Sequence, residues 1–400
     1  MDNDPLLERL RALGVKADQV KPKPEPRKAI DKIIDGTIVK TIFGEAFFVE
    51  SLHPIDEKYG DVQFNSSIDT DLLAAWSNIP ELNASQLAHI CFLDTETTSL
   101  AGGVGTFAFM VGVGCLNADG FYLRQYFLRD PSEEQAMLAS LSEFMTPFSY
   151  VCSFNGKSFD LPLLAGRYTL NSITNPFTGL PHLDLLHLAR KIWRFRLPSR
   201  ALKDLEVELL HVTRGDIEIP GWLVPQIYFD YLRTGETGSI NGVFYHNRLD
   251  VVSLGALLFY SAHLLTYPMQ ASQESLDTMA IARLYESLGR LSEAQHLYDH
   301  CLEMGLPVDY YIDTCMRFAG IYKKACDYVN AVTLWQKAAE LGSFSAHLEL
   351  SKFFEHIEKS PNIALEWIHR AAALAITSTH QTEVAIREKR LLEKIARNCP

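Results

Sequence analysis

The chain has 400 residues, of which 47% are hydrophobic and 22% charged, and its formal net charge at pH 7 is −12. This length predicts two domains, and the composition is that of an ordinary globular protein. The acidic balance argues against broad electrostatic adhesion to nucleic acid, although it leaves room for a local basic groove. The seven cysteines form no CxxC pair, so neither a disulfide framework nor a zinc site is predicted. A reduced, cytoplasmic setting is expected.

The sequence predicts neither a secretory signal at its amino terminus nor a membrane-spanning helix. MDNDPLLERLRALG is acidic from residue 2 and has no apolar core of the kind found in secretory signals. Residues 1–35 are expected to form a short amphipathic helix and a Pro-rich linker, KPKPEPRK. The longest apolar stretch, Val251–Leu265, is too short to span a bilayer and predicts a buried helix.

The middle of the chain alternates between strand and helix patterns. Residues 36–88 predict a β-rich lead-in segment, with TIVKTIF, EAFFVESL and DVQF as strands, followed by a short helix at DLLAAW. Residues 89–268 begin with three consecutive strands, HICFLDTET, FAFMVGVGCL and FYLRQYFL, and continue with an amphipathic helix and the strand YVCSFN. A three-stranded meander followed by helix and strand is the order of a ribonuclease-H-like α/β fold, in which helices flank a mixed sheet.

Residues 272–400 predict helices only and contain an internal repeat. Residues 280–305 are echoed by residues 317–342 and, more loosely, by residues 347–375. The spacing of small and aromatic residues resembles that of tetratricopeptide helix pairs. Three such repeats can stack a continuous core, so this region is expected to dock a protein partner rather than to perform chemistry.

Two acids stand at the end of the first strand of residues 89–268. Asp94 and Glu96 are two residues apart, so their side chains project from the same face of the sheet and can reach one metal ion or a close pair. Two solvated acids on a surface strand are the alternative. The apolar run Ile90–Leu93 describes a buried central strand instead.

Two further acids follow later in the chain. Asp160 comes after Asn155 in FNGKSFD, where a helix is expected to begin; helix amino termini favour phosphate oxygens, but a simple capping role is equally compatible. Asp250 lies in HNRLDVVSL, and His246 precedes it by about one helical turn. Histidine is suited to accept a proton near neutral pH. Taken singly, however, Asp250 reads as a helix-starting residue beside a surface histidine.

The ordered set DxE, NxxxFD and HxxxD resembles the DEDD superfamily of 3′–5′ exonucleases, and more closely the YprB-type ribonuclease-H-like domain. The resemblance covers about half of the chain, from about Ala46 to Leu265. It is carried by FLDTETTSLAGGVGTFAFMVG, RDPSEEQAML, FNGKSFDLPLL, LPHLDLLHLARKIW, YFDYLRTG and HNRLDVVSL.

This resemblance implies a metal-dependent nuclease that hydrolyses phosphodiester bonds with two Mg²⁺ or Mn²⁺ ions. Its ligands would be the four carboxylates, with Asp94 bridging both ions, Glu96 and Asp250 completing the first site, and Asp160 serving the second. His246 would take the proton of the attacking water. The chain departs from the superfamily here, because it has His-x3-Asp where Tyr-x3-Asp or His-x4-Asp is usual.

One basic segment is the candidate for binding nucleic acid. Residues 180–205 collect several cations, interleaved with Trp193 and Phe195, and cations with aromatic rings suit a single strand. A solvated helix face packed through its aromatic side is an equally good interpretation. The candidate substrate-binding residues are Asn155, Arg190, Arg194 and Arg196.

Two other features have a structural interpretation that is preferred. Asp184, with His182 and His187, could assist metal or substrate, but a buried, hydrogen-bonded aspartate is the better interpretation. The AGGVGT turn (residues 101–106) lies between two strands, whereas a dinucleotide fingerprint needs a helix after it, so a hairpin is favoured over a phosphate cradle.

Two other functions remain open. One is a nucleic-acid-binding adaptor with weak or vestigial cleavage, which recruits a partner through the helical repeats. The intact set of acids argues against it. The other is endonucleolytic cutting. The sequence does not separate DNA from RNA as the substrate.

Overall fold

The structure, a computed structural model, describes residues 30, 34–99, 105–235 and 237–398. They fall into two compact units, one formed by residues up to Leu188 together with Ser199–His263, the other by Ala189–Pro198 together with residues from Leu264 onward. Most of the amino-terminal helix and linker and most of the AGGVGT turn predicted above lie outside the described residues.

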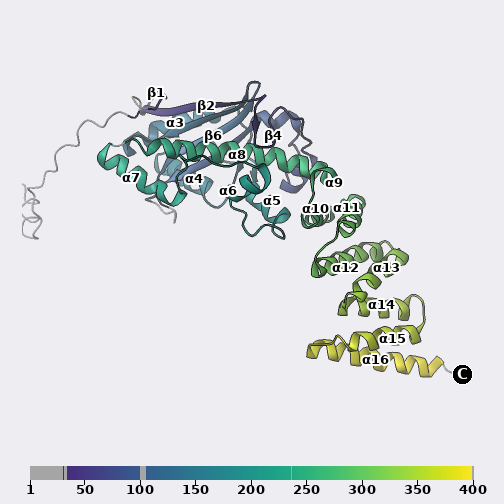
Figure 1. Ribbon diagram of the computed structural model, residues 1–400. Coiled ribbons are helices and arrows are strands. Elements are labelled where there is room, and N and C mark those ends of the chain that lie inside the picture. The colour runs from purple at the N-terminus through teal and green to yellow at the C-terminus, as the bar shows by residue number, and fades with distance from the viewer. Residues whose placement is uncertain (1–29, 31–33, 100–104, 236, 399–400) are drawn as a thin grey trace, which may run out of the picture. The chain divides into compact units, whose positions relative to one another are not determined.

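The first unit is built on a seven-stranded sheet with the order β1-β2-β7-β6-β5-β8-β9. Figure 1 shows α8 (Ile240–Thr266) running across this sheet. The pairs from β1 to β5 are antiparallel, whereas β8 is parallel to β5 and β9 to β8. Strands β5, β6 and β7 form the predicted meander, and helix α3 and strand β8 follow, so the predicted fold is confirmed. The strands are β1 (Thr37–Thr41), β2 (Gly44–Pro54), β5 (Ile90–Thr97), β6 (Ala108–Asn117), β7 (Gly120–Phe127), β8 (Tyr150–Ser153) and β9 (His182–Asp184).

The lead-in strands are part of this same sheet. Strand β2 pairs with β7 from Phe47 to Pro54, and β1 pairs with β2 at the edge. The DVQF segment contributes only β4 (Val62–Gln63), which pairs with β3 (Lys58–Tyr59) in a separate two-stranded hairpin. Residues 36–88 therefore extend the sheet that carries the acids.

Helices cover both faces of the sheet. On one face, the hydroxyl of Tyr126 in β7 donates to the backbone oxygen of Ser140 in α3. The hydroxyl of Tyr168 in α4 donates to the backbone oxygen of Leu138, which is also in α3. Helix α8 covers the other face. The helices of this unit are α2 (Asp71–Ser77), α3 (Glu134–Met145), α4 (Asp160–Leu170), α5 (Leu185–Ile192), α6 (Leu202–Leu205), α7 (Val224–Thr234) and α8 (Ile240–Thr266); the last residues of α5 and α8 belong to the second unit.

Helix α8 lies close against the sheet because two residues of β6 lack side chains. A Cβ atom on Gly112 would lie 2.3 Å from Oδ1 of Asn247 and 2.8 Å from Val251, and one on Gly114 would lie 2.8 Å from Val251 as well. Gly112 is paired with Asp94 across β5 and β6. The close approach of α8 therefore occurs beside the first acid of the DxE pair.

Helix α8 is longer than the apolar stretch Val251–Leu265 from which it was predicted. It begins eleven residues before Val251, at Ile240. Among the described helices it is the one long and apolar enough to cross a membrane, and 72% of its most apolar window is buried inside the protein. Burial of this extent is that of a core helix.

The second unit is helical throughout its described part beyond residue 264. Consecutive helices pair as α10 with α11, α12 with α13, and α14 with α15, and α16 packs on α15. These pairs coincide with the three repeats found in the sequence, whose likeness to tetratricopeptide pairs stays a prediction. The helices are α9 (Pro268–Ala271), α10 (Ser275–Ser287), α11 (Leu291–Met304), α12 (Val308–Lys324), α13 (Tyr328–Glu340), α14 (Phe344–His356), α15 (Pro361–Ala372) and α16 (Ser378–Asn398).

The packing of α8 makes a prediction about Gly112. Gly112→Ala should lower the free energy of unfolding by about 1–3 kcal/mol, because the new methyl group forces Asn247 and Val251 away from the sheet. Urea denaturation followed by circular dichroism measures this. Gly166→Ala in α4 is the matched control, since nothing lies within 4 Å of its Cβ position. Alanine favours a helix there, so this variant should be at least as stable as the parent. Equal midpoints for both variants would contradict the close packing.

Candidate active site

The site is centred on the carboxyl end of β5. Asp94 and Glu96 project from the face covered by α8, and a register shift follows between Glu96 and Thr97, where regular pairing with β6 ends. The preceding residues Ile90–Leu93 are fully buried. A central strand therefore carries two carboxylates on one face, just before an irregularity in its pairing with β6.

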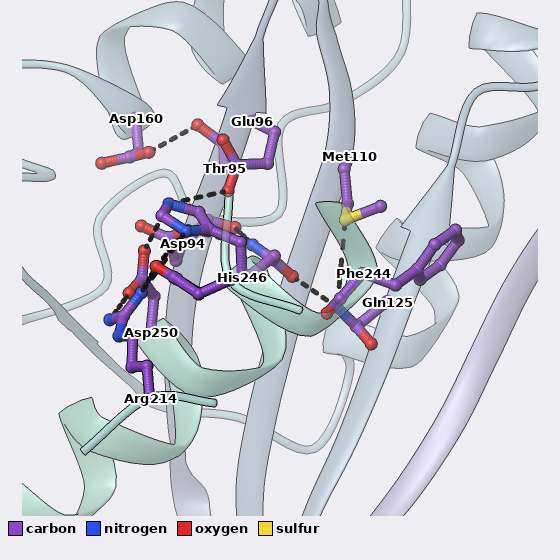
Figure 2. A network of polar contacts seen from close by, with 12 residues as sticks. Asp94, Thr95, Glu96, Met110, Gln125, Asp160, Arg214, Phe244, His246 and Asp250 are labelled. Atoms are coloured by element: carbon purple, nitrogen blue, oxygen red, sulfur yellow. Dashed lines mark hydrogen bonds and ion pairs between the residues drawn. The ribbon is translucent and has the colours of Figure 1, made fainter. Parts of the chain in front are cut away.

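Asp94 is held by a chain of amides from the neighbouring elements. Nδ2 of Asn247 in α8 donates to Oδ2 of Asp94 over 2.9 Å, and Nε2 of Gln125 in β7 donates to Oδ1 of Asn247 over 3.0 Å. Gln125 also donates to the backbone oxygen of Phe244 (Figure 2). Gln125 and Asn247 are almost completely buried, so this chain fixes the Asp94 carboxylate.

Asp160 approaches from the opposite face of the sheet. It is the first residue of α4, and its Oδ1 accepts a hydrogen bond from Oγ1 of Thr95 over 2.5 Å (Figure 2). The turn before it is held by Asp184 of β9, whose carboxylate accepts from the backbone N–H groups of Asn155 (2.8 Å) and Lys157 (3.1 Å). The prediction of a buried, hydrogen-bonded Asp184 is confirmed.

His246 and Asp250 lie one turn apart within α8, not at its start. Nε2 of His246 is 3.5 Å from Oδ2 of Asp250 and 4.0 Å from Oε1 of Glu96. One ligand atom from each of these three residues lies within 4.8 Å of the other two. Figure 2 shows all four predicted acids and the histidine in one place. The structure thus brings together residues that are up to 156 positions apart in the sequence.

The electrostatics of the cluster are unfavourable for ionised acids. Burial raises the pKa of Asp94 well above its usual range, and the carboxylates of Asp250, Glu96 and Asp160 raise it further. Burial, Asp250 and Asp160 also raise the pKa of Glu96, although Arg214 partly opposes them. Burial raises the pKa of Asp160 against the hydrogen bond from Thr95. Positive charge in this space would stabilise the ionised forms.

Four residues of the site were missed by the sequence analysis. Arg214 binds Asp250 and Glu206, Glu218 binds His246, and Asn247 holds Asp94. Asn247 adjoins His246 in the HNRLD motif and could have been noticed there. Glu206, Arg214 and Glu218 lie in a segment that matched no quoted motif, so only their three-dimensional contacts reveal them.

The donor set fits divalent cations. Carboxylate oxygens are what Mg²⁺ prefers, and Mn²⁺ also accepts an imidazole nitrogen. Glu96, His246 and Asp250 surround one position, and Asp94 and Asp160 are close enough to interact electrostatically with Glu96 or with each other. The assignment of the four acids as the cation ligands stays a prediction.

The predicted substrate-binding residues do not all lie in the same unit. Asn155 lies in the first unit, in the turn before α4, with a positive φ of 67°. Arg190, Arg194 and Arg196 lie in the second unit. Arg196 is bound there by Asp277 of α10 over 2.8 Å, and Arg194 lies over the ring of Phe195. The role of these four residues stays a prediction.

Residues 91–260 match the sequence model of the RNase_H superfamily. They form a ribonuclease-H-like domain. Over 358 residues the chain is 28% identical to YprB of Bacillus subtilis (strain 168), which is described as an uncharacterized protein. The matched region covers 84% of this chain and 83% of YprB. The resemblance to the YprB-type ribonuclease-H-like domain is confirmed, and the finer resemblance to DEDD exonucleases stays a prediction. A solved structure, the family B DNA polymerase of the hyperthermophilic archaeon Pyrobaculum calidifontis, is 13% identical with a TM-score of 0.30. That match covers 60% of this chain and 33% of the polymerase, so the chain spans about a third of the polymerase.

The raised pKa of Glu96 predicts how the metal-free domain responds to pH. Its folded pKa lies above the unfolded value of 4.5, so its contribution to stability is fully present below that pH and is lost as pH rises through the folded pKa. Glu96→Gln removes this ionisation. In the presence of a chelator, the variant should therefore lose less thermal stability than the parent between about pH 5 and about pH 8.

The control for this measurement is the exposed Glu57. Glu57→Gln should show the pH dependence of the parent. If the melting temperature of Glu96→Gln depends on pH as it does in the parent and in Glu57→Gln, the ionised Glu96 is not repelled by its neighbours. Melting curves recorded by scanning fluorimetry at each pH are sufficient.

Proposed function

We propose that this chain is a metal-dependent nuclease, a 3′–5′ exonuclease that hydrolyses phosphodiester bonds at single-stranded ends of nucleic acid. The observation that carries the proposal is the convergence of Asp94, Glu96, Asp160 and Asp250, from β5, α4 and α8, into one cluster, in which Glu96 and Asp160 are buried and Asp94 and Asp250 are partly buried. Buried, mutually repelling acids are costly unless cations neutralise them. A ribonuclease-H-like domain with this set of acids is suited to phosphodiester chemistry.

When bound, two divalent cations supply a nucleophile at neutral pH and offset the charge of the leaving oxygen. The protein's own residues prepare that place. Asn247 fixes Asp94, Thr95 fixes Asp160, and the close packing of α8 brings in Asp250. Nε2 of His246 is within reach, through one water, of both Glu96 and Asp250, so it can accept the proton of an attacking water held between them.

Two exposed aromatic rings support a single-stranded substrate. Phe159 directly precedes Asp160 and its residue is 55% exposed. Trp222 is 69% exposed. The residue before it, Gly221, lies beside His246, since a Cβ atom placed on Gly221 would be 3.6 Å from Nε2 of the imidazole. Exposed rings beside a phosphodiester site suit stacking with unpaired bases, which does not depend on sequence.

The first test replaces the central acid. Asp94→Asn should keep the fold but lower cleavage of labelled oligonucleotides in Mg²⁺ or Mn²⁺ by at least about 100-fold, because the variant loses a charged cation ligand. The assay should use single- and double-stranded DNA and RNA, each with a free or a blocked 3′ end. If only the oligonucleotides with a free 3′ end become shorter, the protein is a 3′–5′ exonuclease.

The matched control is Asp216→Asn, an exposed acid in the loop that carries Arg214 and Glu218, which should cleave like the parent. If Asp94→Asn cleaves as fast as the parent, the proposal fails. Metal-independent binding of oligonucleotides with no turnover at high protein concentration would favour the adaptor function instead. Cutting of blocked 3′ ends would indicate endonucleolytic activity.

Stacking by Trp222 makes a separate prediction. Trp222→Ala should raise KM for single-stranded oligonucleotides about 10-fold while kcat changes little, because a stacking contact is lost and the acids are untouched. Trp222→Phe should restore most of the affinity. Phe43→Ala is the control, since this exposed ring lies in the turn between β1 and β2, at the far edge of the sheet from β5. Equal KM values for all variants would exclude Trp222 from the substrate path.

A further inference from the structure

A buried ion network lies beside the four acids and is not part of them. Nε and Nη2 of Arg214 donate to the two carboxylate oxygens of Glu206 over 2.7 and 2.6 Å. The side chain of Arg214 is 4% exposed and that of Glu206 is fully buried. This two-point contact fixes the plane of the guanidinium group. We call Glu206, Arg214 and Glu218 the brace.

Arg214 connects the brace to α8. Its Nη2 binds Oδ1 of Asp250, and its Nη1 donates to Oε1 of Glu218 over 2.8 Å. Because Oδ1 of Asp250 is engaged by Arg214, Oδ2 is the oxygen that lies near Nε2 of His246. The brace thereby sets which oxygen of Asp250 faces the cluster.

Glu218 connects the brace to His246. Its Oε1 lies 2.9 Å from Nδ1 of the imidazole. An ionised carboxylate only accepts hydrogen bonds, so Nδ1 must carry the proton of this contact. Nη1 of Arg214 is farther from Nδ1, at 3.4 Å, and already donates to Glu218. Nε2 is therefore the nitrogen that faces Glu96 and Asp250.

Folding alone gives a poor reason for an acid at position 218. The side chain of Glu218 is 10% exposed, and its Oε2 is buried with no hydrogen-bond partner among the described residues. A buried oxygen without a partner is destabilising. Glu218 also lies close enough to Glu96 to add to the repulsion that this acid experiences. A local arrangement that opposes stability beside a functional cluster is typical of a functional constraint.

We infer that Glu218, held in place by Arg214 and Glu206, is a positioning residue that orients His246 so that an unprotonated Nε2 faces the attacking water. The inference rests on the proposed function, in which His246 accepts a proton. It extends that function by assigning the loop between α6 and α7 a part in the chemistry. An acid that selects the tautomer of a catalytic imidazole is a general device in enzymes.

The test has a readout that needs no activity. In metal-free protein with ¹⁵N-labelled histidine at about pH 8, the imidazole nitrogen shifts of His246 should report the Nδ1–H tautomer. His246→Gln assigns the signal. Glu218→Gln should lower the population of the Nδ1–H tautomer of His246, because a neutral amide oxygen accepts a hydrogen bond more weakly than a carboxylate and the amide nitrogen can instead donate to Nδ1. Glu208→Gln, an exposed acid in the segment that follows α6, should leave the signal unchanged.

Kinetics provide the second readout. Glu218→Gln should lower kcat by about 10- to 100-fold and change KM by less than about 2-fold, since the substrate contacts remain. Arg214→Lys keeps the charge but loses the two-point contact with Glu206, so an intermediate loss of kcat is expected. Thermal melting of each variant shows whether it is folded, and the tautomer readout is confined to folded variants.

The outcomes separate the two proposals. An unchanged tautomer together with unchanged kcat in folded Glu218→Gln would overturn the inference and leave the nuclease proposal standing. A tautomer shift in a protein whose parent cleaves no substrate would support the positioning role while the nuclease proposal fails. If Glu218→Gln does not fold, a parental tautomer and kcat in Arg214→Lys would overturn the inference, whereas a tautomer shift with reduced kcat would support it.

Discussion

Repulsion among buried carboxylates is the constraint around which the first unit is arranged. Asp94, Glu96 and Asp160 all have pKa values raised by burial and by neighbouring acids. Such a cluster persists only if the surrounding structure holds each acid firmly. Amides and hydroxyls do this here, with Asn247 on Asp94 and Thr95 on Asp160. The scaffold therefore stores electrostatic energy that positive charge would release.

The geometry depends on small details of packing as much as on the acids. Because Gly112 has no side chain, α8 lies close enough to β6 for Asn247 to reach Asp94, and Gln125 then orients the amide. The same approach carries His246, which adjoins Asn247, and Asp250, which lies one helical turn after His246. A shift of α8 by the width of a methyl group would move three contributors to the site together.

The fold was largely predictable because its signals are local. The alternation of strand and helix patterns gave the meander, α3 and β8, and the DxE spacing placed Asp94 and Glu96 on one face. The pairing of β2 with β7 was not predictable, because it joins residues about 75 positions apart and no local pattern encodes it. The start of α8 at Ile240 was missed for a different reason. The polar HNR segment interrupts the apolar pattern of this helix, because its polar side chains line the site.

The brace was hidden from sequence reasoning because its members, which all lie between α6 and α7, act on residues of α8. Glu206, Arg214 and Glu218 look like ordinary surface charges in a line of sequence, yet their side chains are at most 10% exposed. Only the folded chain shows that they meet α8.

Arg214 also divides the acids of the site into two groups. It supplies one positive charge against six carboxylates, and its contacts are with Glu206, Glu218 and Asp250. Burial opposes its charge, but the hydrogen bonds of Glu206 and the charges of Asp250 and Glu206 raise its pKa overall, so it stays charged. Asp94, Glu96 and Asp160 have no such direct partner in the contacts described above. Unbalanced negative charge is therefore greatest on the side formed by β5 and the start of α4, and cations should be drawn most strongly there. On the α8 side, Arg214 engages Oδ1 of Asp250, so Oδ2 is the oxygen that faces His246.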